Sequence, residues 1–335
     1  MKKAVIVGCG NSGIKIATVL DSTKDNVSLI GACDLNIARA QKIAEKSGAK
    51  AYSDYRKMFA ELKPELAFVA VPPYCTDEIL SCAAENKINF MTESPVSLNS
   101  ERCGEIIEKI YENGIVTAVK NPLLPSKLMR VAKQFADKNP VIRVGAEYIT
   151  PPPDMFWKRD EELSGGILLE KGMFLLESLS FLFGSVRASH VYTQRGFVSG
   201  IADYNTDDIL CADMMFERRT CANIILGNYA SDSGRAVLTM DSFGKRLELY
   251  ESEVRIYGDS FDPGKTKKML HNGEILPDSV EDGCLIYKND ENITPESAFI
   301  DAVENGKADP MLLDYEIGVK MLQVALNLRK GKLAK

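Results

Sequence analysis

The chain is poor in the residues that proteins use to bind metal ions. It has only two histidines, His190 and His271, and neither lies close in sequence to a group of cysteines or carboxylates. Its eight cysteines are scattered, without a C-x-x-C pair or the spacing of a disulfide framework. Because metal sites and disulfide scaffolds need such spacings, we expect no metal site and expect free thiols in a reducing compartment.

Long apolar runs and an excess of positive charge are also missing. No apolar run reaches the length of about 20 residues that a membrane-spanning helix needs. The net charge of −6 disfavours nucleic acid and anionic membranes as partners, because both attract basic surfaces. The first residues resemble a signal peptide only faintly, since Gly8, Gly10 and Lys15 interrupt the apolar part. We therefore expect a cytoplasmic protein with a small-molecule substrate.

The composition is that of an ordinary globular protein, with 45% hydrophobic and 26% charged residues, and a chain of 335 residues favours two domains. Over the first 120 residues, short apolar runs alternate with helical patterns. This alternation predicts a doubly wound parallel sheet with helices on both faces. We expect strands at 3–8, 27–33, 66–71, 88–92 and 115–119, with helices at 12–21, 36–47, 55–62, 76–86 and 99–112.

A glycine motif follows the first expected strand. Gly8, Gly10 and Gly13 form the pattern G-x-G-x-x-G, with Asn11 and Ser12 inside it. Glycines at these positions allow a sharp turn, close approach of a diphosphate and tight packing of the next helix. A plain strand-to-helix turn is the alternative, but the flanking strand and helix patterns favour a dinucleotide site of the Rossmann type.

The acidic residue after the second expected strand indicates which dinucleotide binds. Asp34 follows Gly13 at about the 20-residue spacing typical of this motif. A carboxylate there accepts hydrogen bonds from the ribose hydroxyls and repels a 2′-phosphate. Arg39 lies nearby but does not directly follow Asp34. We predict NAD as the cofactor, with NADP less favoured.

The second half of the chain has a different pattern. It predicts a mostly antiparallel sheet with helices on one face. We therefore expect a Rossmann domain at 1–121 and a substrate and oligomerisation domain at 122–335. The final helix of the second domain is able to pack back on the first domain. Residues 259–293 are too polar to assign. The expected strands are 141–150, 191–197, 208–216, 221–230, 236–240, 247–250 and 254–257, and the helices 126–137, 166–183, 295–304 and 312–328.

One strand of this second sheet carries apolar residues on both faces. Cys221, Ile225 and Tyr229 alternate with Ile224 and Leu226. An apolar open face is typical of an interface, so we expect a homo-oligomer formed through this face. A monomer whose own loops cover the face is the alternative.

Several short strings, together with the order of the elements, resemble the Gfo/Idh/MocA oxidoreductase family over nearly the whole chain. They are the glycine motif with Asp34, Val71-Pro72-Pro73, Glu93-Ser94-Pro95, Trp157-Lys158-Arg159-Asp160, Gly165-Gly166 and Ser297 to Val303. The resemblance implies that NAD(P) binds in the first domain and that the substrate site lies between it and the open sheet. The residues then expected to contact the cofactor are Gly8, Gly10, Asn11, Ser12, Gly13, Asp34, Val71, Pro72, Glu93, Ser94 and Pro95.

The chain departs from this family at three positions. Typical members have Glu-Lys-Pro where this chain has Ser94 in the middle position, and that lysine lies between nicotinamide and substrate. Typical members also have an Asp, and four residues later a His, where this chain has Glu170 and Phe174. A histidine common after the proline turn is replaced by Thr76. The three changes, to Ser94, Phe174 and Thr76, each remove a group that titrates or carries charge near the hydride path, whereas Glu170 keeps a carboxylate in place of the Asp.

Alcohol oxidation still needs a base, and three residues are candidates. Glu170 shares a helix face with Phe174 and Glu177, and partial burial beside an aromatic ring is expected to raise its pKa. Lys171 and Lys120 are the other candidates. The plainer alternatives are a salt bridge for Glu170 and solvated charges for the lysines. Around the substrate we expect Trp157, Phe174 and Thr76, although the two aromatic residues would also suit a core.

Three functions remain open. The first is an NAD(P)-dependent oxidoreductase of a sugar, a polyol or a related carbonyl compound, with unusual acid and base residues. The second is a reductase of a conjugated substrate that needs little proton transfer, as the resemblance to biliverdin reductases allows. The third is a cofactor-binding regulator without turnover. A retained cofactor site favours an enzyme over a regulator.

Overall fold

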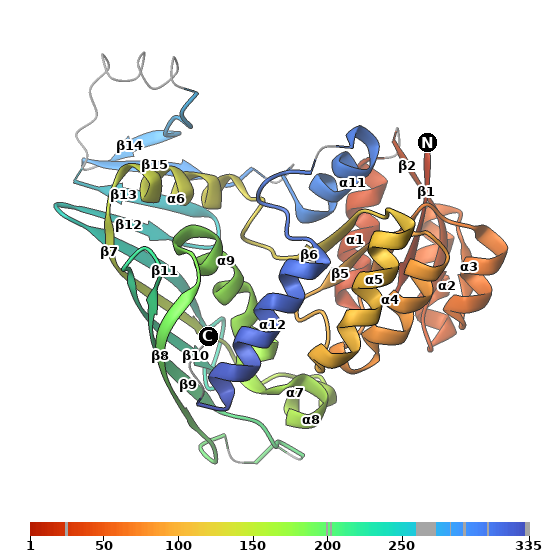
Figure 1. Ribbon diagram of the computed structural model, residues 1–335, viewed down its shortest axis with the longest axis horizontal. Coiled ribbons are helices and arrows are strands. Elements are labelled where there is room, and N and C mark those ends of the chain that lie inside the picture. The colour runs from red at the N-terminus through yellow and green to blue at the C-terminus, as the bar shows by residue number, and fades with distance from the viewer. Residues whose placement is uncertain are drawn as a thin grey trace. The chain divides into compact units, whose positions relative to one another are not determined.

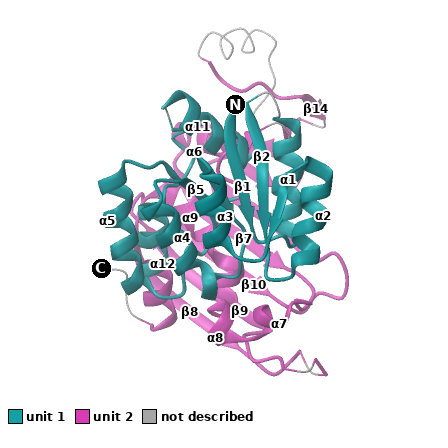
Figure 2. Cartoon of the chain, turned by 90° about the vertical axis from the view of Figure 1, so that its right-hand side faces the viewer, with its two compact units in different colours: residues 1–121, 294–323 teal, residues 122–293, 324–335 magenta. Residues whose placement is uncertain are grey.

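A computed structural model of the protein describes residues 1–23, 26–198, 200–201, 203–258, 273–281, 283–290, 293–306 and 308–331 (Figure 1). The chain forms two compact units. Unit 1 comprises Met1–Asn121 with Thr294–Gln323, and unit 2 comprises Pro122–Ile293 with Val324–Lys335 (Figure 2). The segment from Thr294 therefore returns to the first unit, whereas the sequence interpretation placed everything after residue 121 in the second domain and let only 312–328 pack back.

Unit 1 contains a six-stranded sheet in the order β3-β2-β1-β4-β5-β6. All neighbouring strands are parallel, which confirms the doubly wound sheet expected from the sequence. The short edge strand β3 was not expected, because its three residues show no alternation. The strands are β1 (Lys2–Val7), β2 (Val27–Cys33), β3 (Lys50–Tyr52), β4 (Leu66–Val69), β5 (Asn89–Glu93) and β6 (Thr117–Lys120).

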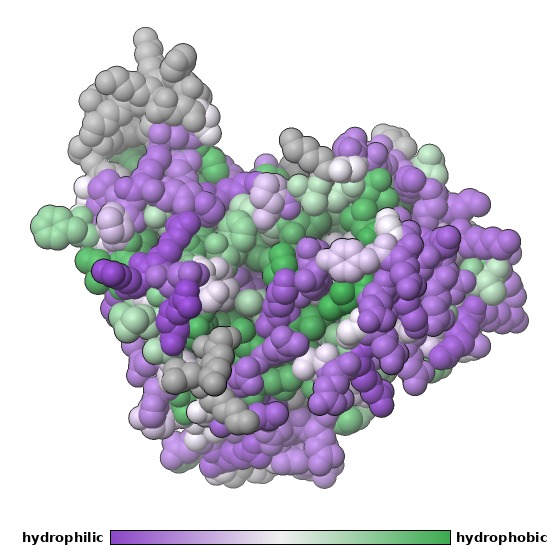
Figure 3. All heavy atoms as spheres, viewed as in Figure 1, coloured by the Kyte–Doolittle hydropathy of each residue, from purple (hydrophilic) through white to green (hydrophobic). Residues whose placement is uncertain are grey.

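Helices connect these strands, and their ends follow from local sequence. Asn36 accepts a hydrogen bond from the amide of Ala38 at the start of α2, and Asp54 accepts one from Arg56 at the start of α3. Hydrophilic residues cover α4 and α5 in the view of Figure 3, as expected of amphipathic helices. The helices are α1 (Asn11–Ser22), α2 (Ile37–Ser47), α3 (Tyr55–Leu62), α4 (Thr76–Glu85) and α5 (Cys103–Asn113), with short 3-10 turns η1 (Pro73–Cys75) and η2 (Ser100–Arg102).

The carboxy-terminal part of unit 1 completes its core. Helix α11 (Pro295–Asn305) begins at a capping box formed by Thr294 and Ser297. Phe299 of this helix is fully buried and packs edge-to-face on Phe68 of β4, with ring centroids 5.6 Å apart. Helix α12 (Tyr315–Arg329) starts in unit 1, where Tyr315 packs against Phe90, and ends in unit 2.

Unit 2 contains a nine-stranded sheet in the order β14-β15-β13-β12-β11-β7-β10-β9-β8. Strands β7 and β10 pair in parallel and the other neighbours are antiparallel, which confirms the mostly antiparallel sheet. Strands β14 and β15 lie in the polar segment that the sequence left unassigned. The strands are β7 (Val141–Ile149), β8 (Val186–Gln194), β9 (Ile209–Phe216), β10 (Cys221–Gly227), β11 (Arg235–Ser242), β12 (Lys245–Leu249), β13 (Glu253–Tyr257), β14 (Ser279–Glu281) and β15 (Cys284–Lys288).

The helix expected at 166–183 contains an irregular turn. Its first part is a π-helical turn, η3 (Leu168–Gly172), and the regular helix α9 (Met173–Phe183) follows. The other helices of unit 2 are α6 (Lys127–Lys138), α7 (Phe156–Arg159) and α8 (Glu161–Ser164). Among the residues that the structure describes, no helix of either unit combines the length and apolar character needed to cross a membrane.

Candidate functional site

The glycine motif forms the turn between β1 and α1. Gly8 has a φ of +96°, and a Cβ there would lie 2.2 Å from the carbonyl oxygen of Ala70. A Cβ on Gly13 would lie 2.0 Å from the carbonyl oxygen of Gly8. A Cβ on Gly10 would meet no atom within 4 Å. The fold therefore requires Gly8 and Gly13, while Gly10 leaves open space over the start of the helix.

That open space faces the unpaired amides of the first helical turn. Gly10 is the N-cap of α1 and provides no side-chain cap, so the amides of Asn11 and Ser12 have no partner from it. Helix starts of this kind bind phosphate through their amides and the positive end of the helix dipole. The geometry is that of a diphosphate site.

Asp34 lies at the end of β2 and is linked to this turn. Its Oδ2 accepts a hydrogen bond of 2.8 Å from the amide of Cys9, and its Oδ1 accepts one of 2.8 Å from the amide of Asn36. Carboxylate oxygens have further lone pairs, which can accept ribose hydroxyls. Arg39 is exposed in the first turn of α2.

The two cysteines beside Asp34 are buried. Burial, with Asp34 adding to the effect, raises the pKa of Cys9 to about 12, and burial also raises the pKa of Cys33 to about 12. Both thiols therefore stay protonated at neutral pH and behave as small apolar side chains.

A polar network occupies the carboxyl ends of β5 and β6. The Lys120 Nζ lies 3.0 Å from the hydroxyl of Ser12, 3.2 Å from Glu93 Oε1 and 3.0 Å from Glu296 Oε1. The Ser12 hydroxyl also donates a short hydrogen bond to Glu93. The structure thus joins three residues that the sequence assigned to cofactor or catalysis, Ser12, Glu93 and Lys120, with one that it did not.

The added residue is Glu296, in the first turn of α11. Its residue exposure is only 4%, so its charge needs a partner, and Lys120 provides one. Burial acts to lower the pKa of Lys120, but Glu93 and Glu296 outweigh it and raise this pKa above the usual lysine value. The sequence gives a capping pattern before Glu296 but nothing that connects it with Lys120.

The other residues expected at the cofactor follow the same strand ends. Val71 and Pro72 are half-buried after β4, and the Ser94-Pro95 peptide bond after β5 is cis. Thr76 is buried, and its hydroxyl donates to the carbonyl of Pro72 at 3.2 Å. This position favours a local structural role for Thr76 over the expected contact with substrate.

Unit 2 brings a second set of candidates together. Lys158 of α7 pairs with Glu170 of η3 at 2.5 Å. This ion pair is the salt bridge that the sequence left open as the plainer alternative for Glu170. Glu170 as the base remains a prediction from the sequence alone.

The neighbouring Lys171 is enclosed by protein, with a residue exposure of 6%. Its Nζ donates a short hydrogen bond to the Thr150 hydroxyl, lies 3.5 Å from the Gly227 carbonyl oxygen and sits 5.6 Å from the centre of the Tyr148 ring. Burial lowers the pKa of Lys171 to about 8, with Glu170 opposing and Lys158 adding to this effect. A lysine with this pKa is partly a neutral amine near neutral pH and can accept a proton.

Aromatic residues border these charged groups. Tyr148 and Phe174 pack edge-to-face with ring centroids 5.1 Å apart, and the Lys158 ammonium lies 5.3 Å from the centre of the half-buried Trp157 ring. Burial, followed by the charge of Glu170, raises the pKa of Tyr148, so its phenol stays a hydrogen-bond donor. Phe174 and Trp157 were expected from the sequence, but Tyr148 was not, because alternation along its strand does not distinguish it from other half-buried positions.

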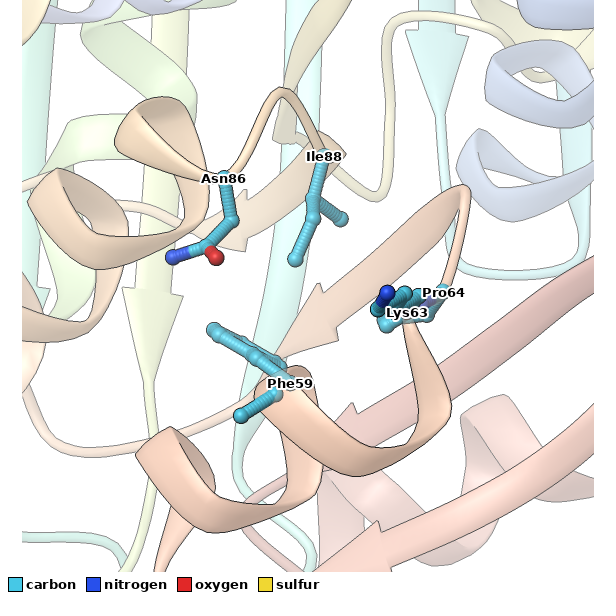
Figure 4. A pocket seen from close by; sticks show the side chains of 6 residues that line it. Phe59, Lys63, Pro64, Asn86 and Ile88 are labelled. Carbon is cyan, nitrogen blue, oxygen red and sulfur yellow. The ribbon is translucent and has the colours of Figure 1, made fainter.

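The cavity drawn in Figure 4 lies elsewhere in unit 1. It has a volume of about 270 Å³ and is lined by Phe59, Ala60, Lys63, Pro64, Asn86 and Ile88. These residues precede β4 and β5, at the amino ends of strands whose carboxyl ends carry the residues expected to contact the cofactor. Among the described residues, no group of three or more histidines, cysteines and carboxylates could hold a metal ion. His271 lies outside the described residues.

The fold and the glycine motif define a dinucleotide-binding protein of the Rossmann type, and comparison with known proteins agrees. Residues 2–121 match the GFO_IDH_MocA family model, described as an oxidoreductase family with an NAD-binding Rossmann fold. The match covers the nucleotide-binding part of the chain and is to the family that its short strings resemble.

Known relatives are distant. The chain is 24% identical over 220 residues, 63% of this chain and 57% of the relative, to 2,7-anhydro-N-acetylneuraminate hydratase of Mediterraneibacter gnavus. It is 23% identical over 193 residues, 54% of each chain, to D-glucoside 3-dehydrogenase of Escherichia coli. These matches span little more than half the length of either relative.

Solved structures share the whole fold. Biliverdin reductase from Synechocystis sp. PCC 6803, in complex with biliverdin and NADP+, superimposes with a TM-score of 0.77 at 16% identity and covers 98% of each chain. At this identity the likeness establishes the fold of both units and leaves the substrate open.

Proposed function

We propose that the protein is an NAD-dependent oxidoreductase that interconverts a hydroxyl and a carbonyl group on a sugar, polyol or related small molecule. The observation that carries the proposal is the enclosed Lys171, whose pKa of about 8 suits a proton acceptor near neutral pH. A lysine is otherwise costly to bury, so its place among Thr150, Tyr148 and Glu170 favours a chemical role over a structural one.

The reaction divides between hydride and proton. NAD, held by the glycine motif and Asp34, would supply the hydride acceptor for the carbon that carries the hydroxyl group. The neutral amine of Lys171 takes the hydroxyl proton, beside the ring of Tyr148. In the reverse direction the Lys171 ammonium returns the proton to the carbonyl oxygen. The ion pair between Lys158 and Glu170 holds the charges around Lys171 in place.

Asp34 supports NAD as the cofactor. Both of its oxygens are fixed by backbone amides at the end of β2, where a 2′-phosphate would meet its negative charge. The nearby Arg39 is the residue that would favour NADP instead, and direct measurement of both affinities decides between them.

A sugar or polyol substrate is supported by the similarity to D-glucoside 3-dehydrogenase and by the aromatic surroundings of Lys171. Aromatic rings such as those of Trp157 and Tyr148 pack well against the apolar faces of sugar rings, while charged groups orient the hydroxyls. Conjugated compounds would also pack on these rings, so they belong in the same test.

The test is a panel of sugars, polyols, keto-sugars and conjugated compounds, with NADH absorbance as the readout. We expect turnover whose kcat/KM for oxidation rises with pH to a midpoint near 8, and Lys171→Met to lose it. Lys133→Met, which removes a surface lysine of the same unit, is the control. Unchanged turnover in Lys171→Met contradicts Lys171 as the base, and NADH binding without any turnover favours the regulator.

We further propose that a second copy of the chain covers the open face of the unit 2 sheet. The face carries the exposed side chains of Met215 and Cys221. A stripe of alternating charge crosses it, in which Asn223 links Asp213 to Arg143, and Arg143 pairs with Asp241. Such a stripe is complementary to itself after a twofold rotation. Sedimentation of the wild type and of Arg143→Glu tests this, and a monomeric wild type contradicts it.

A further inference from the structure

Helix α11 places a buried carboxylate at the cofactor site of unit 1. Glu296 Oε1 lies 3.0 Å from the Lys120 Nζ, and the two side chains are only 5% and 15% exposed. Glu93 from β5 and the Ser12 hydroxyl from α1 face the same ammonium. Lys120 is therefore held between three elements of one unit.

The strand order tells which half of a dinucleotide this network faces. Asp34 at the end of β2 marks the ribose of the adenosine half, and the diphosphate binds at the start of α1. The sheet order β2-β1-β4-β5-β6 then carries the other nucleotide half toward the ends of β4, β5 and β6. Glu93 and Lys120 end two of these strands, and Ser12 belongs to the diphosphate turn.

We propose that Glu296 is a positioning residue that keeps the Lys120 ammonium charged and fixed beside the diphosphate and the nicotinamide half of the cofactor. The proposal rests on the NAD binding proposed above. It assigns a function to a residue whose chemistry the sequence did not reveal, and it makes α11 part of the cofactor site.

The charges of the network predict how this role is detected. In the wild type, two carboxylates keep Lys120 protonated against the cost of burial. In Glu296→Gln only Glu93 remains, so the pKa of Lys120 falls and its ammonium is lost as the pH rises. At neutral pH the same variant keeps the ammonium and loses one negative charge, which does not oppose an anionic cofactor.

The experiment measures the Kd of NADH by fluorescence between pH 7 and pH 10. For Glu296→Gln we expect a Kd within about twofold of the wild type at pH 7 and about tenfold weaker at pH 10. The control is Asp301→Asn, which removes the same charge from an exposed position of the same helix. Its profile should follow that of the wild type, and Glu296→Asp should restore binding at pH 10.

Lys120→Met provides an independent check. It should weaken NADH binding at pH 7 by about tenfold. In the Lys120→Met background, adding Glu296→Gln should no longer change how the Kd depends on pH. If the Kd of Glu296→Gln for NADH changes with pH in parallel with that of the wild type, the inference is overturned and the proposed function stands. An equal loss of affinity at every pH, caused by a less stable fold, is such a parallel profile. A wild type that binds no NADH overturns both.

Discussion

The carboxylate of Asp34 accepts a 2.8 Å hydrogen bond from the backbone amide of Cys9, inside the glycine motif. The residue expected to contact the cofactor ribose is thus also a support for the turn expected to bind the diphosphate. Binding at either point stabilises the geometry of the other, because both share this hydrogen bond.

Replacing Asp34 should therefore affect binding at more than the ribose. We expect Asp34→Ala to raise the Kd of NADH by about tenfold and to narrow the preference for NADH over NADPH. Asp54→Ala is a matched control, since it also loses a carboxylate bonded to a backbone amide, at the start of α3. Titration of each variant with both reduced cofactors checks this, and equal losses in the two variants would contradict it.

Gly13 and Gly10 should respond differently to one added methyl group. Gly13→Ala places a Cβ against the carbonyl oxygen of Gly8, so we expect a loss of about 3 kcal/mol in the free energy of unfolding. Gly10→Ala meets no neighbouring atom, so the fold should keep its stability while the diphosphate loses its close approach. Urea unfolding and NADH titration on both variants separate the effects. A destabilised Gly10→Ala would show that the space over the helix is not open.

The buried Lys171 should reduce stability at neutral pH. Its pKa is lowered from the usual 10.5 to about 8, so the unfolded chain binds more protons than the folded chain between these two pH values, and the cost of burying the charge is fully present below pH 8. We expect Lys171→Met to gain about 3 kcal/mol in the free energy of unfolding at pH 7. The gain should shrink as the pH rises from 8 and vanish above 10.5. Denaturant unfolding at several pH values checks the trend, and a constant difference would contradict it.

Thiol labelling should report on both burial and assembly. Cys9 and Cys33 are buried with pKa values of about 12, so they should not react with iodoacetamide in the native protein at pH 8. Cys221 is exposed on the open face and should react in the dilute protein. If a second copy covers this face, the reaction of Cys221 slows as protein concentration rises. Mass spectrometry of labelled peptides measures each site, and a rate independent of concentration argues against that interface.

The parallel sheet of unit 1 and the turn of the glycine motif were largely predictable from the sequence. The glycines at 8, 10 and 13 are spaced along the chain itself, and Asp34 follows at a distance set by one helix and one strand, so local pattern was sufficient. Strand β3 was not predicted, because three residues at a sheet edge are too few to show an alternation of apolar and polar side chains.

The partners of Lys120 and Lys171 could not be predicted from the sequence, because they meet these lysines only through contacts in three dimensions. Glu296 reaches Lys120 from a helix near the other end of the chain, and Tyr148 meets Lys171 only because strand β7 and turn η3 pack together. The burial of Lys171 also depends on a π-helical turn, whereas the sequence pattern indicated a regular helix. Contacts between distant segments leave no spacing signal in a single sequence.

The return of the chain to unit 1 also affects how the protein is made. Phe299 belongs to the core of the parallel sheet, together with Phe68 and residues of β1 and β2. A ribosome must therefore synthesise Pro122–Ile293, the larger part of unit 2, before the last layer of the first core emerges. Domains generally fold as units during synthesis. Here the core of the amino-terminal unit stays incomplete, and Glu296 is missing from it, until α11 has been synthesised. For recombinant work, a fragment that ends at Asn121 would lack that helix, so the nucleotide-binding unit is best expressed as part of the full chain.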